Sequence, residues 1–99
     1  GFFVDSLGWA HYRLGEHEKA LGYLEHASRL EPTDPVITEH LGDVLWRLGR
    51  EVEARYQWRK ALAFDPVEED REKIENKLVT GLEAMPEIAP EALTGGTEI

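Results

Sequence analysis

Apolar residues in the first third of the chain recur every three to four positions, which is the spacing of one face of an α-helix. The pattern predicts helices over residues 4–14 and 18–30, joined by a turn at Gly15. Glycine suits this turn because it adopts the left-handed conformation that ends many helices. Pro32 follows the second helix, where a proline stops helix growth. Residues 1–34 therefore predict one helix–turn–helix unit.

The same pattern returns 34 residues later, with helices expected over residues 35–48 and 52–64. Glycines and alanines at matched places would let the two helices of a unit approach closely. Because such a pair cannot bury its apolar face alone, the two units are expected to stack. The residues that coincide are Leu7 with Leu41, Gly8 with Gly42, Arg13 with Arg47, Leu14 with Leu48, Gly15 with Gly49, Ala20 with Ala54, Ala27 with Ala61, and Pro32 with Pro66.

A fifth helix is predicted over residues 67–85, where apolar residues again recur at helical spacing. Its first turn is acidic, which favours a helix N-terminus. Glu75 and Asn76 stand where a third Leu-Gly pair would fall, so this helix is expected to cap the stack with a polar back. Prolines and glycines after residue 85 predict a flexible tail. The expected organisation is a helical domain at 1–85, with repeats at 1–34 and 35–68, a capping helix at about 68–85, and a tail at 86–99.

The spacing of these residues resembles the tetratricopeptide repeat (TPR), whose pattern is Trp-x2-Leu-Gly-x2-Tyr, then Ala-x3-Phe, then Pro. The resemblance covers residues 1–66 and implies an all-α, right-handed solenoid of two helix pairs plus a capping helix. The chain departs from the family pattern at the positions where other residues replace Trp, Tyr and Phe. The matching positions are Val4, Leu7, Gly8, His11, Ala20, Leu24 and Pro32, then Thr38, Leu41, Gly42, Leu45, Ala54, Trp58 and Pro66.

Two segments, 5–10 and 40–47, look like the terminal repeats of bacterial multi-TPR proteins. The chain opens on Gly1 without an initiating Met or a basic targeting segment, so we expect a piece of a longer protein with further repeats upstream. The first helix would normally pack on a preceding repeat. Self-association through Phe2 and Phe3 is therefore a further expectation.

In TPR proteins the first helix of each unit lines a concave groove that holds a protein or peptide. Trp, Tyr and Arg, which dominate binding hot spots, occur at the corresponding positions of this chain. By resemblance, the groove residues would be Asp5, Trp9, Tyr12, Arg13, Glu39, His40, Asp43, Trp46 and Arg47.

An alternative stays open from the sequence. Trp9 and Trp46 would pack between the units and the arginines would pair with Asp43 or Glu39, leaving a structural end-cap with no ligand of its own. The family's mode of clamping acidic chaperone C-termini uses Lys and Asn in the first helix. Asp5, Trp9 and His40 stand there instead, which disfavours that mode.

The formal net charge of −9 is concentrated late in the chain: residues 1–66 carry 11 acids and 8 bases, and residues 67–99 carry 9 acids and 3 bases. This balance argues against nucleic acid and anionic membrane surfaces as partners. No apolar run approaches the roughly 18 residues of a membrane span. The composition is that of a soluble domain, and both cytoplasm and periplasm remain open.

Catalytic and metal-binding chemistry has little support in the sequence. The chain has no cysteine, and none of its four histidines has a metal-ligating partner at i+4. No phosphate loop, dinucleotide-binding glycine pattern or nucleophile elbow occurs. We therefore predict no catalytic residues, no metal and no cofactor, and a protein or peptide as the partner.

Overall fold

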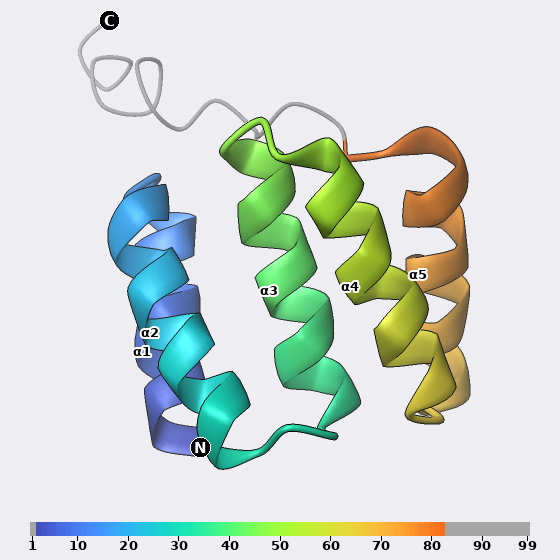
Figure 1. Cartoon of the computed structure of the whole chain (residues 1–99), viewed down its shortest axis with the longest axis horizontal. Coiled ribbons are helices and arrows are strands. Elements are labelled where there is room, and N and C mark those ends of the chain that lie inside the picture. Colours follow the sequence, from blue (N-terminus) through green and yellow to red (C-terminus); the bar gives the residue numbers. More distant parts are fainter. Residues whose placement is uncertain (1, 83–99) are drawn as a thin grey trace, which may run out of the picture.

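The computed structural model describes residues 2–82 and contains no strand in that range, which confirms the all-α class. Figure 1 shows α1 behind α2 at one end of the molecule, α3 in the middle, and α5 behind α4 at the other end. Helices α2 and α3 pack on each other and so join the two units. The helices are α1 (Phe2–Arg13), α2 (His17–Leu30), α3 (Pro35–Arg47), α4 (Glu51–Ala63) and α5 (Glu68–Thr80).

The turns within the two units are built alike. Gly15 and Gly49 have φ angles of +81° and +83°, which few residues other than glycine adopt without strain. Between the units, the Asp34 carboxylate accepts hydrogen bonds from the backbone N–H groups of Val36 and Ile37, at 2.9 and 3.1 Å. This carboxylate caps α3 and fixes the start of the second unit.

Close helix contact within each unit depends on one glycine. A Cβ atom placed on Gly8 would lie 2.8 Å from Cγ of Leu24 in α2. One placed on Gly42 would lie 2.5 Å from two ring atoms of Trp58 in α4. Leu24 and Trp58 are the largest fully buried side chains of their units' second helices, and the glycines provide the room for them.

Helix α5 is shorter than the sequence predicted. We expected it to reach residue 85, and it ends at Thr80 because Gly81 takes a φ angle of +75° and leaves the helix. Ile74 is fully buried and anchors α5 in the core. Residues 83–85 and the predicted flexible tail at 86–99 lie outside the described residues.

Helix α5 also continues the phase of the repeat. Helices α1, α3 and α5 begin 33 residues apart, at Phe2, Pro35 and Glu68. Helix α5 packs on α4, as α3 packs on α2. It therefore occupies the place of the first helix of a third unit, although its sequence lacks the Leu-Gly pair.

Candidate functional site

The nine residues predicted from the TPR resemblance fall into three exposure classes. Four of them are buried, with 4 to 7% of their surface accessible: Asp5, Tyr12, Glu39 and Asp43. Four more are partly buried, namely Trp9, His40, Trp46 and Arg47, and Arg13 is exposed. Much of the expected binding surface is therefore engaged in contacts within the chain.

Trp9 lies between two other rings at the junction of the units. Its indole stacks on the His40 imidazole of α3, with ring centroids 3.9 Å apart, and on the Tyr12 ring, 4.4 Å away. The His40 Nδ1 atom is 2.8 Å from Oδ1 of Asp5 in α1. Because Asp5 and His40 belong to different units, their hydrogen bond ties α1 to α3.

Tyr12 and Arg47 form a second link of the same kind. The Arg47 Nε–H donates to the Tyr12 hydroxyl oxygen at 3.1 Å. Burial raises the pKa of the Tyr12 phenol above 10.0, and this outweighs the opposing hydrogen bond from Arg47. The phenol therefore stays neutral in the folded protein well into the alkaline range.

The two buried acids of α3 are held by a lysine of α5. The Lys77 ammonium donates to both carboxylate oxygens of Asp43, at 2.9 and 3.0 Å, and to Glu39. Trp58 Nε1–H also donates to Asp43, at 3.0 Å. Burial by itself lowers the pKa of Lys77, but the carboxylates of Asp43 and Glu39 raise it by more, so its net pKa is above 10.5.

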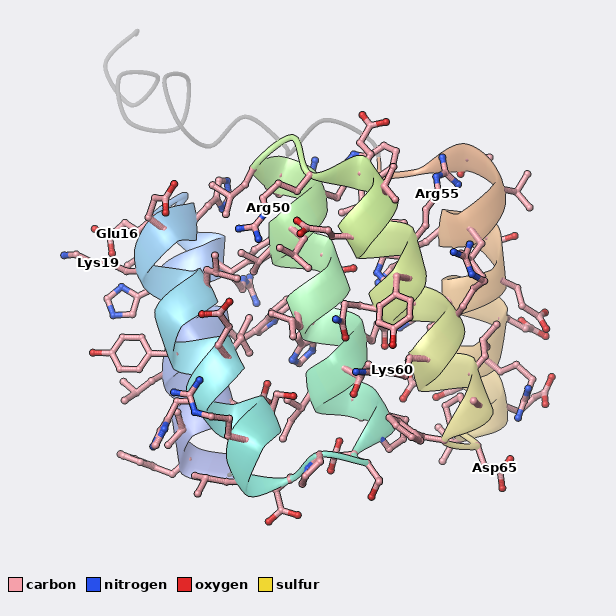
Figure 2. The ribbon with its side chains drawn as sticks, viewed as in Figure 1. Glu16, Lys19, Arg50, Arg55, Lys60 and Asp65 are labelled. Atoms are coloured by element: carbon pink, nitrogen blue, oxygen red, sulfur yellow. The ribbon has the colours of Figure 1, made fainter. Side chains whose placement is uncertain are left out.

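Trp46 is covered by the end of α5. Its ring lies 5.6 Å from that of Trp58, and the Arg55 guanidinium sits 5.2 Å from the Trp46 ring centroid. Arg55 also donates a hydrogen bond to the carbonyl oxygen of Leu78. Figure 2 shows Arg55 on the side of α4 that faces α5. Trp46 is therefore part of the packing between α3, α4 and α5.

A hollow of about 660 Å³ opens beside Trp9, and we call it the Trp9 hollow. It brings together four of the nine predicted residues: Asp5, Trp9, Arg13 and His40. Ser6, Ala10 and Leu14 complete its wall. The hollow is formed mainly by α1 and its following turn, and Glu39, Asp43 and Trp46 lie apart from it, in contact with α5 or its end.

Sequence reasoning missed Lys77, the cation that binds the buried acids. A signal was present, since Lys77 stands 34 residues, one repeat length, after Asp43. The cross-unit pairs Asp5–His40 and Tyr12–Arg47 show nearly the same spacing, 35 residues. Complementary side chains one repeat apart therefore mark the contacts between successive first helices.

Among residues 2–82, no group of three or more His, Asp or Glu side chains is arranged to hold a metal ion. In the same part of the chain, every helix is too short or too polar to cross a membrane. Neither observation adds a ligand to the Trp9 hollow.

Comparison with known families supports the resemblance. The family model of the tetratricopeptide repeat matches residues 5–34. The chain carries a tetratricopeptide repeat. The matched segment contains α2 and most of α1, and so includes the α1 residues of the Trp9 hollow. TPR units generally mediate protein–protein interaction and generally act as non-enzymatic scaffolds. Searches of curated proteins and of solved structures gave no match to this chain.

Proposed function

We propose that the chain binds a protein or peptide through the Trp9 hollow. The observation that carries this proposal is the exposed Arg13 guanidinium beside the partly open Trp9 indole, in a hollow on the first helix of a TPR unit. Arg and Trp are the residue types that contribute most to binding hot spots. The proposed site is smaller than the nine-residue groove expected from the sequence.

The charges of the hollow favour a partner that brings a carboxylate. Asp5 is buried and already bonded to His40, whereas Arg13 is exposed at the rim. Ser6 is also exposed there and offers a hydroxyl donor. A guanidinium can hold a carboxylate through two parallel hydrogen bonds. The site therefore fits an acidic side chain or a chain terminus, with an apolar neighbour against Trp9.

The test is selection of binders from a random peptide library on the full chain, followed by affinity measurement. We expect enriched peptides to contain Asp, Glu or a free C-terminus next to an apolar residue. Arg13→Glu should weaken their binding by about 1.5–3 kcal/mol, the range of hydrogen bonds to charged groups. Arg59→Glu is the matched control, because Arg59 is also exposed but lies on α4.

An alternative function is a structural end-cap. Asp5, Tyr12, Glu39 and Asp43 are committed to contacts within the chain, which is the observation in its favour. If no peptide is enriched, or if Arg13→Glu and Arg59→Glu bind selected peptides equally, the Trp9 hollow is not the site and the end-cap function is preferred.

A further inference from the structure

The outward side of α1 exposes a stripe of apolar residues. Phe3, Leu7 and Leu14 follow one another at helical spacing and have accessible fractions of 75%, 36% and 73%. Their counterparts in the second unit, 34 residues later, are Ile37 at 2%, Leu41 at 7%, and the partly buried Leu48. The same positions are thus covered in one unit and open in the other.

The cover in the second unit is α2, which packs against α3. Within residues 2–82, no helix takes the corresponding place against α1. The apolar surface continues from α1 onto α2 through Tyr23, which is 37% exposed and stacks on the His11 ring, with centroids 5.2 Å apart. We call Phe3, Leu7, Leu14 and Tyr23 the α1 face. An exposed apolar patch of this kind is typical of a protein-interaction surface.

The opposite end of the molecule has a different chemistry. The exposed residues of α5 are mostly charged, and they include four glutamates and one lysine. An α1 face placed against this surface would bury charges without partners, which is costly. Stacking of copies end to end is therefore disfavoured, and the surface that best matches the α1 face is another α1 face. The exposed residues of α5 are Glu68, Glu69, Glu72, Lys73, Glu75, Asn76, Val79 and Thr80.

We propose that two copies of this chain pair through their α1 faces about a two-fold axis. In such an isologous interface, residue i of one copy contacts residue j of the other, and j contacts i. Glu16 and Lys19 are both exposed and border the α1 face, and Figure 2 shows them on the outer side of α1 and α2. Because these two residues carry opposite charges, Glu16 of each copy can lie near Lys19 of the other copy.

A contact within the chain holds one charged residue of this border in place. Glu16 is 2.6 Å from His11 Nδ1 of the same chain, so its carboxylate is held at the edge of the α1 face. Lys19 lines a hollow of about 490 Å³ with His11 and Tyr23, next to the apolar stripe. The α1 face therefore has an apolar centre and a polar border, the arrangement found in specific interfaces.

The experiment is measurement of molar mass by light scattering and sedimentation, for the full chain over a wide concentration range. We expect a concentration-dependent dimer. Phe3→Glu should weaken dimerisation about tenfold or more, because a two-fold axis brings both new charges into one apolar interface. Val79→Glu is the matched control, since Val79 is 79% exposed on α5.

Each result has a definite meaning. A dimer that is lost in Phe3→Glu and kept in Val79→Glu supports the proposal, provided that circular dichroism shows both variants folded. A chain that stays monomeric at every concentration overturns it. A dimer equally sensitive to both variants, or to Val79→Glu alone, also overturns it. Phe3 lies outside the Trp9 hollow, so Phe3→Glu should leave the binding of selected peptides to the hollow intact.

Discussion

The Lys77 ammonium hydrogen-bonds both carboxylate oxygens of Asp43, at 2.9 and 3.0 Å, and joins equivalent positions of two successive first helices. Asp43 is 4% exposed and receives a further hydrogen bond from Trp58. Helix α5 thus docks through a buried ion pair as well as through Ile74. Removing one partner from such a pair costs more than the pair itself contributes, because the other charge stays buried.

We predict that Lys77→Met destabilises the fold by about 3 kcal/mol, since it leaves the carboxylates of Asp43 and Glu39 buried without their cation. Urea unfolding followed by circular dichroism measures the change. The double variant Asp43→Asn with Lys77→Met should be more stable than Lys77→Met alone, because the Asn amide oxygen still accepts from Trp58 Nε1–H. Equal stabilities of the single and double variants would contradict a buried ion pair.

Alkaline pH should weaken the fold through the same lysine. The pKa of Lys77 is raised in the folded state, so its contribution is complete below 10.5 and is lost as pH rises through the higher folded value. The raised pKa of Tyr12 acts in the same direction above 10.0, because the fold favours the neutral phenol. We predict that Tm falls above about pH 10.

Lys77→Met supplies the control for this pH dependence. It lacks the lysine, so its Tm should fall less steeply than that of the parent chain across the same alkaline interval. Thermal unfolding at a series of pH values gives both curves. Parallel curves would show that Lys77 does not contribute to the alkaline loss.

The two contact glycines should differ in how much an added methyl group costs. A Cβ at Gly42 meets the fully buried Trp58 ring at 2.5 Å, and the ring has no room to move away. We expect Gly42→Ala to cost about 3 kcal/mol, the upper part of the range for overpacking. Gly8→Ala should cost about 1 kcal/mol, because the nearest atom to its added Cβ, Cγ of Leu24, lies farther away, at 2.8 Å.

Gly22 provides the opposite prediction within the same set of variants. It lies inside α2, and no atom stands within 4 Å of an added Cβ. Gly22→Ala should therefore stabilise the fold by about 0.5–1 kcal/mol, the difference in helix propensity. Chemical unfolding of the three alanine variants under one set of conditions tests the order. A Gly8→Ala loss larger than that of Gly42→Ala would refute the packing argument.

Capping of α3 by Asp34 can be measured separately. Asp34→Ala removes the acceptor for the N–H groups of Val36 and Ile37 and should cost about 1 kcal/mol. Asp34→Ser keeps a capping oxygen and should lose much less. Thermal unfolding compares both variants with the parent chain, and an Asp34→Ala variant as stable as the parent would mean that the cap contributes nothing.

Much of the fold follows from local signals in the sequence. Gly15 and Gly49 were predicted to end helices, and their positive φ angles confirm it. Gly8 and Gly42 were predicted to permit close contact, and both lie against a buried side chain of the second helix. The predicted end of α5 at residue 85 was wrong. Gly81 breaks the helix, although the helical pattern of apolar residues continues past it.

The site was harder to predict because residues at the positions of a binding groove also form contacts within the chain. Asp5 and Asp43 have the sequence positions of groove residues, and the partners that bury them, His40 and Lys77, are one repeat away. Helical periodicity describes one helix at a time and does not report such pairs. Only Arg13 could be expected to stay exposed on local grounds, since it ends α1 beside a turn.

Because α5 holds the phase of a first helix, its side chains decide whether a further second helix could pack on it. Glu75 and Asn76 stand in register with Leu41 and Gly42, and Gly42 is the position against which the second helix of its unit packs. Replacing Glu75-Asn76 with Leu-Gly would give α5 a surface on which a second helix can pack. A designer could then append a second helix there and extend the chain, unit by unit, in one direction.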